Sequence, residues 1–418
     1  MHRRQFHSVS LAAALGSNGA SCQTPKPPKA KAMTSLTEQS AAKLVPPRPG
    51  ALPPLAPAAP GAPTGYLRPY ANERLNSRLT RPLPPGPFTA SWNAPIDPGI
   101  KPAGLLASGA SVFALGLAGY HLFVAQKPVT QGVTTGRDAE LLPGNNAFFV
   151  PDRYGRIASF NLTTAAAGLV LSAAGGIGTK RTYFHRRPSG VTLVASTAES
   201  SSPHNPAPTR VMYLQVFDAA GNATASRDGL NVPLHVAMHE DFPVLARPGV
   251  LEFLDLSLNS QRRLVIDMAP HGLSLDETGR SYLLCAVNHR QQLWIVAPTG
   301  EYVASRLPEG LTVFQRPPIV GYDHRVYLLS QQRVLCYSAA GELAWQYEAP
   351  ARVAGATVSA DGQLLTAVGD AVVALNAKGE ARPLCRMPGE EQVASPILGS
   401  AGELYALTGR RLHCFAIG

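Results

Sequence analysis

From about residue 88 to the C-terminus, short apolar runs alternate with tight polar turns, and this arrangement returns about every 40 residues. In a clear copy, the turn Ser359–Gly362 precedes the apolar runs Leu364–Val368 and Val372–Leu375, and the glycine-bearing turn Ala377–Glu380 leads to a last run. Short apolar and β-branched runs between Gly, Asp and Asn are typical of β-hairpins, and no helical period is sustained. Each copy is therefore predicted to be a four-stranded antiparallel sheet.

The number of copies follows from the third apolar run of each, and eight such runs are recognised. They contain Tyr120, Ile157, Tyr213, Leu251, Leu293, Val334, Val372 and Leu412. Their spacings are about 37 to 42 residues, as in a repeat protein, except across an insertion at 196–209. This insertion is rich in Ser and Pro and is expected to be a flexible loop. We predict an all-β fold: an eight-bladed β-propeller of four-stranded antiparallel blades, with seven blades as the alternative.

The two ends of the repeat region indicate how the ring closes. The last copy ends at Gly418 after three strands, whereas Ser91–Pro95 resembles Ala344–Pro350, an outer strand of another copy. An N-terminal strand that pairs with the last blade would remove an open sheet edge, which otherwise invites aggregation. The propeller is therefore predicted to span 88–418 and to be closed by an N-terminal strand.

Two phrases carry a family resemblance, namely Gly341–Trp345 before a Pro-bearing strand, and Ser395–Ile397 leading to Glu403–Leu407. They resemble the repeat of the PQQ-like (quinoprotein-type) propellers. The resemblance implies the fold rather than an activity, because propellers host many unrelated functions. Quinoprotein dehydrogenases of this type carry adjacent cysteines and a calcium cluster of Glu, Asn and Asp, and neither is found in this sequence. No PQQ-site residues are recognised, so no cofactor and no metal are expected.

The first 22 residues have the character of a targeting segment. Arg3 and Arg4 precede a short Ala-rich apolar stretch, Ser8–Leu15, and small residues lead to Cys22. This resembles a twin-arginine export signal that ends in a lipoprotein cleavage box, although Gly19 stands where such a box usually has Leu. We predict an export and lipoprotein signal at 1–22 with lipidation of Cys22, and a tail on a cytosolic protein is the alternative. No other stretch approaches the roughly 20 apolar residues that span a bilayer.

Residues 23–87 differ from both neighbours in composition. They are rich in Pro, Ala and Lys, which cannot bury a core, so we predict a disordered, semi-extended linker. Residues 66–87 are more varied in composition. For them two further interpretations stay open, a partner-binding segment or a segment that lies along the propeller.

The net charge of +10 is concentrated in the N-terminal part of the chain. Residues 1–87 contain 11 Lys and Arg against Glu38 and Glu73, which leaves 26 Lys and Arg against 25 Asp and Glu in residues 88–418. A nearly neutral propeller is not a phosphate-binding body, so nucleic acid is not expected as a partner. The basic linker suits the neighbourhood of anionic lipid headgroups or simply keeps the segment extended and soluble.

The cysteines after Cys22 are Cys285, Cys336, Cys385 and Cys414. No two of them have CxxC or zinc-finger spacing, so a zinc site is not expected. We predict buried structural residues, and a disulfide in an oxidising compartment is left open.

The loops that enter the first strand of each copy, and those that join its second and third strands, are the usual site of propeller function. The candidates there are His235, His271, His289, Arg290, Arg316, Asp152 and Arg153, and Arg186 and Arg187 form a basic cluster before the first turn of the third copy. This set has several Arg and His but few carboxylates, which favours recognition of an acidic or polar partner over acid–base catalysis. His235 and His239 are four residues apart, but on a strand they would stand roughly 13 Å from each other, too far for a metal site.

These observations predict a non-catalytic, lipid-anchored interaction scaffold for envelope proteins, periplasmic or at the cell surface and monomeric. In fold, size and anchoring the sequence resembles the BamB-like lipoproteins, with a longer Pro-rich spacer. The alternative is a propeller hydrolase or lyase that acts on a sugar or lactone near His235, His271, His289 and Arg316, or a glycan-binding module that uses the same central pocket.

Overall fold

The computed structural model describes residues 44–45, 48–50, 52 and 78–418, apart from 109, 117–118, 133–139, 143–146, 152–155, 162–166, 173–178, 187–188, 203–204, 231–234, 240–241, 267 and 288–289. Residues 38–418 form one compact unit. The predicted signal at 1–22 and its Cys22 lie outside the described residues. In the described residues the regular secondary structure is β-strand, apart from the single 3-10 turn η3 (Pro98–Ile100).

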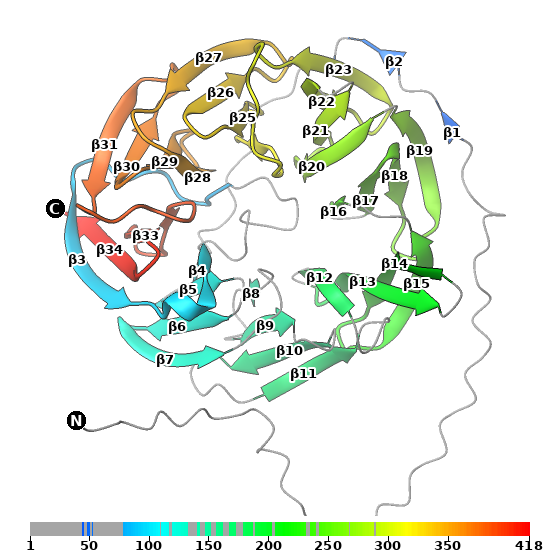
Figure 1. The fold of residues 1–418 in the computed structure, drawn as a ribbon, viewed down its shortest axis with the longest axis horizontal. Helices are drawn as coiled ribbons and strands as arrows, with labels where there is room; N and C mark the ends of the chain where they lie inside the picture. The colour runs from blue at the N-terminus through cyan, green and yellow to red at the C-terminus, as the bar shows by residue number, and fades with distance from the viewer. Residues whose placement is uncertain are drawn as a thin grey trace, which may run out of the picture. The chain divides into compact units, whose positions relative to one another are not determined.

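Within the described residues, the strands form eight sheets that follow one another around a ring in Figure 1. We call each sheet a blade and number the blades in chain order of their first strands. Blade 1 contains β4 (Pro102–Ser108), β5 (Ser111–Gly116), β6 (Tyr120–Val124) and β7 (Lys127–Gly132). Blade 2 contains β8 (Glu140–Leu142), β9 (Ala147–Pro151), β10 (Arg156–Asn161) and β11 (Ala167–Ser172). Blade 3 contains β12 (Thr179–Arg186), β13 (Thr192–Ser202), β14 (Asn205–Phe217) and β15 (Ala223–Leu230).

The later blades repeat this order. Blade 4 contains β16 (His235–Met238), β17 (Pro243–Arg247), β18 (Gly249–Leu254) and β19 (Ser260–Ile266). Blade 5 contains β20 (Ala269–Leu275), β21 (Ser281–Val287), β22 (Arg290–Val296) and β23 (Glu301–Arg306). Blade 6 contains β24 (Ile319–Val320), β25 (Val326–Leu329), β26 (Arg333–Tyr337) and β27 (Leu343–Glu348). Blade 7 contains β28 (Val353–Val358), β29 (Leu364–Val368), β30 (Ala371–Leu375) and β31 (Ala381–Arg386). Blade 8 contains β32 (Ile397–Leu398), β33 (Leu404–Leu407), β34 (Arg411–Ile417) and β3 (Phe88–Pro95).

Neighbouring strands within each blade pair antiparallel, and every predicted third-run position lies in the third strand of its blade. The predicted all-β propeller of four-stranded antiparallel blades is therefore confirmed. Two short additional strands, β1 (Leu44–Val45) and β2 (Arg48–Pro49), pair with the outer edges of blades 4 and 5.

A turn that has glycine at a positive φ recurs between the strands. In the last turn of blade 7, the Gly379 N–H donates to the Asn376 carbonyl at 2.9 Å, and Gly379 has a φ of 81°, which favours glycine. A Cβ at this position would also lie 2.8 Å from the Trp345 ring of blade 6. Glycine is thus required both by the turn and by the close approach of the next blade.

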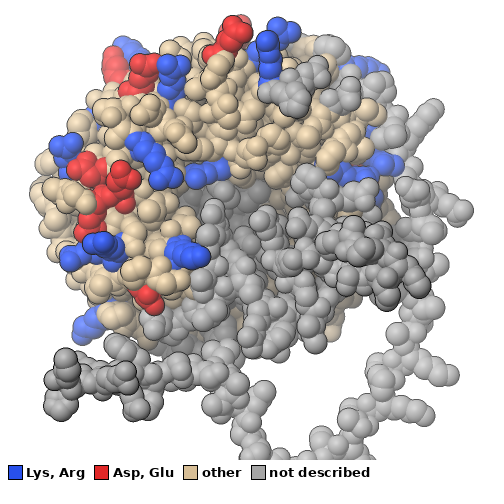
Figure 2. Space-filling view, viewed as in Figure 1, with Lys and Arg blue, Asp and Glu red and all other residues tan. Residues whose placement is uncertain are grey.

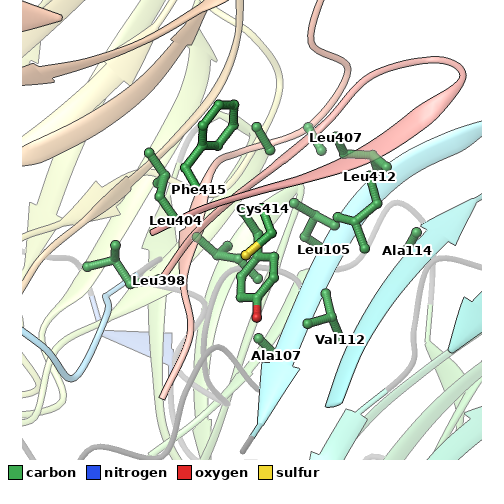
Figure 3. Packing of buried hydrophobic residues seen from close by; sticks show 14 of the residues in the cluster. Leu105, Ala107, Val112, Ala114, Leu398, Leu404, Leu407, Leu412, Cys414 and Phe415 are labelled. Atoms are coloured by element: carbon green, nitrogen blue, oxygen red, sulfur yellow. The ribbon is translucent and has the colours of Figure 1, made fainter. Parts of the chain in front are cut away.

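The ring closes as predicted. The N-terminal strand β3 pairs antiparallel with the C-terminal strand β34, with Trp92 opposite Cys414 and Ala94 opposite Leu412. Figure 3 shows Leu407, Leu412 and Cys414 of blade 8 beside Leu105 of blade 1, within one buried cluster. The first and last blades are therefore joined by backbone pairing and by apolar packing.

The core lies between blades rather than inside one sheet. Consecutive strand residues point to opposite faces, so Leu364 packs in a cluster shared by blades 6 and 7, whereas Leu365 packs in the cluster with blades 8 and 1. Both faces of an inner strand are therefore buried. This explains why the strands are read in the sequence as continuous apolar runs rather than as alternating ones.

The insertion at 196–209 is not the predicted loop. Strands β13 and β14 extend through it as one long hairpin, with Ser196 opposite Tyr213 and Ser202 opposite Asn205. Backbone pairing continues beyond the length of an ordinary blade strand, and such pairing does not depend on apolar side chains. The Ser-rich composition therefore indicated a loop where a β-ribbon forms.

Candidate functional site

The first strand of each blade lies nearest the central axis (Figure 1), and three predicted residues lie on or next to such strands: His235 in β16, His271 in β20 and Arg316 three residues before β24. His235 begins β16, and its Nε2 lies 3.1 Å from the Pro270 carbonyl oxygen in β20. His271 follows directly. A Cβ on the next residue, Gly272, would lie 2.2 Å from the Arg316 carbonyl oxygen. The packing of the first strands of blades 4 and 5 thus places His235 beside Pro270 and His271, while of Arg316 it is the backbone that lies next to Gly272.

The two histidines are neutral at pH 7. Burial lowers the pKa of His235, and the nearby His271 adds to that lowering. Burial also lowers the pKa of His271, whose Nδ1 is buried without a hydrogen-bond partner in the described residues. Because the Pro270 carbonyl can only accept, the His235 proton is assigned to Nε2. Neither imidazole is hydrogen-bonded to a carboxylate among the described residues, so this pair is suited to binding a polar group rather than to proton transfer.

Arg316 connects blades 6 and 7. Its Nη1 donates to the Ala354 carbonyl of β28 at 2.8 Å, and its guanidinium lies 4.8 Å from the centre of the Phe314 ring. Beside it is a cavity of about 20 Å³, lined by Arg316, Ile319, Tyr327, Ser395 and their neighbours. A volume of this size holds about one water molecule. This cavity is too small for the sugar or lactone of the alternative function.

The other predicted residues are not gathered with this group. Arg290 begins β22, and its guanidinium is 4.0 Å from Glu309, with both side chains largely exposed. Such a pair contributes little to stability and leaves the arginine available to a partner. Arg186 is the last residue of β12. His289, Asp152, Arg153 and Arg187 lie outside the described residues.

Sequence reasoning missed a buried carboxylate between blades 3 and 4. Glu252 on β18 is fully buried, and its carboxylate lies 3.0 Å from Arg227, 3.7 Å from Arg247 and 3.8 Å from Arg263. The arginines come from three different strands, β15, β17 and β19. Nothing in the sequence marks Glu252, because its three arginines come close to it only once the blades are packed.

A second missed group lies in blade 8. The Thr408 hydroxyl donates to Glu390 at 2.6 Å, and His413 Nε2 lies 3.3 Å from the same carboxylate. The Thr408 hydrogen bond first, and then that of His413, holds the pKa of Glu390 below its usual value. This contact ties the loop before β32 to the third strand of the blade, and no spacing in the sequence indicates it.

At the opposite ends of the first strands, Arg78 is clamped between blades 5 and 6. Only 5% of this residue is exposed. Its Nε donates to the Val320 carbonyl at 2.8 Å, its Nη2 to the Gly321 carbonyl at 2.6 Å, and its Nη1 to the Glu277 carboxylate at 2.5 Å. The guanidinium also lies 4.7 Å from the centre of the Tyr322 ring. These partners lie at the end of a first strand or in the turn that follows it.

The clamp is the start of a longer contact. The Leu79 N–H donates to the Val358 carbonyl at 2.7 Å, and the Leu83 N–H donates to the Asp361 carboxylate at 2.9 Å. Leu79 and Leu83 are buried. We call residues 78–87 the strap. Within the segment 23–87, predicted as a linker, the last ten residues thus pack along the propeller, which is one of the readings left open for 66–87.

Next to Glu277 in the chain is a fully buried carboxylate, that of Asp276. Burial alone would raise the pKa of Asp276, but hydrogen bonds from His324, Thr278 and Tyr282 lower it to about 2. His324 is only 1% exposed, with Nδ1 3.2 Å from Asp276 and Nε2 3.3 Å from Glu277. The imidazole therefore joins the first turn of blade 6 to both carboxylates in the first turn of blade 5, one of which, Glu277, accepts from Arg78.

Charges of both signs are mixed elsewhere on the surface. Figure 2 shows Lys and Arg close to Asp and Glu over the described part of one face, without a large patch of one sign. Among the described residues, no three His, Cys, Asp or Glu are grouped as a metal site would require. No helix in this part of the chain is long and apolar enough to cross a membrane.

The four propeller cysteines are free and buried. Burial raises the pKa of Cys336 and of Cys385 to about 12, and that of Cys414 to about 11. Burial also raises the pKa of Cys285. Because the thiolate is the reactive form, these cysteines pack as small apolar residues and are poor nucleophiles.

A comparison with protein families finds none that matches the chain. A comparison with curated proteins also finds no match. Among solved structures, the chain is similar to BamB from Moraxella catarrhalis, with a TM-score of 0.53 and 14% identity, over 78% of this chain and 97% of that one. It is also similar to a europium-containing methanol dehydrogenase, with a TM-score of 0.59 and 11% identity, over 85% of this chain and 98% of that one. At such identities the likeness concerns the fold alone, and the chain has the PQQ-like, BamB-like propeller fold.

Proposed function

We propose that the protein is an exported propeller, anchored through a lipid on Cys22, that binds other proteins of the bacterial envelope without catalysing a reaction. The observation that carries the proposal is the likeness of its fold to BamB over 97% of that chain. Arg3 and Arg4 before a short apolar stretch, and small residues before Cys22, support the export and anchoring parts.

Fold likeness alone does not choose between BamB and the methanol dehydrogenase, and the site residues support a role like the former. The sequence has no pair of adjacent cysteines, and His235 and His271 are neutral imidazoles without a carboxylate partner in the described residues. General acid–base catalysis needs groups that exchange protons near the working pH. The exposed Arg290 offers a planar donor fork to a carboxylate of a partner protein. Recognition is therefore favoured over turnover.

The test is to recover the protein from detergent-solubilised envelopes and identify what co-purifies. Four versions are compared: wild type, Cys22→Ser, Arg290→Glu and Arg382→Glu. We expect a stoichiometric partner with wild type and Arg382→Glu, and loss of the partner with Arg290→Glu. We expect Cys22→Ser to move to the soluble fraction. If the wild type is soluble and recovered alone, both anchoring and scaffolding are refuted.

A further inference from the structure

Two short pieces of the Pro-rich segment lie on the rim of the propeller as added strands. Strand β1 pairs parallel with β19, with Leu44 opposite Arg263, and β2 pairs parallel with β23, with Arg48 opposite Glu301. Figure 1 shows β1 and β2 outside β19 and β23, at the outer edges of blades 4 and 5. The edges of these two blades are thus covered by the chain itself.

The prolines of this segment fit the pairing. The Arg48 N–H donates to the Gly300 carbonyl at 3.0 Å, and the Gly50 N–H donates to the Tyr302 carbonyl at 3.3 Å. Pro49, which has no N–H, lies between these two donors. In a parallel pair, alternate residues direct their backbone groups to the partner strand, so Pro49 occupies a position that needs no donor. It also leaves the new outer edge without a donor, which discourages further pairing.

Side chains add charge and apolar contact to the backbone bonds. The Thr299 hydroxyl first, and then the charges of Arg48 and Arg262, lower the pKa of Glu301 in β23. Leu52, half-buried, packs against the apolar cluster between blades 5 and 6. Leu44, Arg48 and Leu52 are spaced by four residues. The backbone of Leu44 pairs with blade 4, that of Arg48 pairs with blade 5, and Leu52 packs at the boundary of blades 5 and 6.

We give the name clasp to Leu44–Val45, Arg48–Gly50 and Leu52, and the name tether to the chain between Cys22 and its first fixed point on the propeller. From this register we propose that the clasp holds the tether shortened against the rim of blades 4 to 6. The clasp consists of two short strands and one apolar contact, so it is a releasable element. The strap at Arg78, with its buried side chain, is the permanent attachment.

The consequence for reach rests on the proposed anchoring at Cys22. Leu44 lies 22 positions after Cys22, whereas Arg78 lies 56 positions after it. At roughly 3.1 Å per residue for an extended Pro-rich chain, the tether spans at most roughly 70 Å with the clasp docked and roughly 170 Å with it released. Release would more than double the distance over which the propeller can reach a partner.

Hydrogen exchange on the full chain with Cys22→Ser tests the docking without any lipid. Residues 46, 47 and 49 are prolines without amides, so a peptide over this segment reports mainly on Val45, Arg48 and Gly50. We expect exchange at least tenfold slower than in a free peptide of the same sequence. Arg48→Pro, which removes a donor, should abolish this protection, whereas Pro49→Ala, which removes none, should keep it.

Small-angle scattering on the same proteins tests the change in reach. Arg48→Pro and Leu52→Asp should raise the maximum dimension, and Pro49→Ala should leave it unchanged. Unprotected amides in the wild type, or protection that survives Arg48→Pro, would overturn the clasp. Protection that grows with protein concentration would overturn it in favour of exchange between two copies. Because these measurements need no anchor, failure of lipidation at Cys22 would refute the proposed function and leave the docking result standing.

Discussion

Replacing Arg78 with alanine tests whether the strap is held by its clamp. The guanidinium is buried and donates to two backbone carbonyls and one carboxylate. Removing one member of a buried ion pair costs about 3–5 kcal/mol. The other member, Glu277, is 27% exposed and can take up water, which places the cost at the lower end. We expect about 3 kcal/mol, since the Val320 and Gly321 carbonyls also lose their donor.

The assay must separate local detachment from global unfolding, because a propeller of many blades does not unfold in a single step. With roughly 2 °C per kcal/mol for a large domain, the thermal midpoint should fall by roughly 6 °C. Hydrogen exchange should quicken at the amide of Leu79, which donates to Val358, and at that of Ala360, which donates to Arg81. Both amides report on the strap directly.

Two further variants make the test specific. Arg78→Lys keeps one charge near Glu277 but loses the planar fork, so it should show an intermediate loss of about 1–2 kcal/mol. Arg382→Ala is the matched control, because its Nη1 reaches the Gly86 carbonyl of the same strap at 3.4 Å from an exposed position. It should change stability by less than about 0.5 kcal/mol. If Arg78→Ala left both the midpoint and the two amides unchanged, the clamp would be refuted.

Three other perturbations have outcomes that the geometry fixes. Thr357→Val removes a buried hydroxyl that donates to the Pro396 carbonyl at 2.7 Å between blades 7 and 8, and it should cost about 1–3 kcal/mol in chemical denaturation. Gly272→Ala forces a Cβ to 2.2 Å from a backbone carbonyl of the next blade and should lower the thermal midpoint, whereas Gly409→Ala, with nothing within 4 Å, should not. The folded-state pKa of Asp276, about 2, lies below the ordinary value of 3.8 for an aspartate, so its contribution of about 2 kcal/mol is present above pH 4 and lost as the pH falls toward 2. Stability measured between pH 5 and pH 2 should show this loss in the wild type and not in Asp276→Asn.

The repeat could be predicted because side chains of the same kind recur at corresponding positions of different blades. Trp92 in Ser91–Pro95 resembles Trp345 in its own outer strand, and both occupy outer strands because the same packing problem recurs at each blade. The placement of His235 and His271 on neighbouring first strands also followed from the period, since corresponding strands of consecutive blades are neighbours.

Side-chain patterns did not predict the strap, the long hairpin or the clasp. Arg78 is held mainly by the carbonyls of Val320 and Gly321, and any residue supplies a carbonyl. The hairpin of β13 and β14 is likewise a matter of backbone pairing, as is the docking of Arg48 on β23. Composition describes what side chains favour, so it assigned these segments to loop or linker, although their backbone groups are paired.

The strap and the candidate recognition residues lie at opposite ends of the first strands. In β20, His271 lies near the beginning of the strand, and Asp276 follows its end. Five residues of strand separate them by roughly 17 Å. The chain from the tether is therefore fixed at one end of the propeller, while the residues that we propose for recognition lie at the other. A partner that binds at the His271 end does not compete with the strap for the same surface, so weakening the Arg78 clamp should loosen the tether without removing the recognition surface.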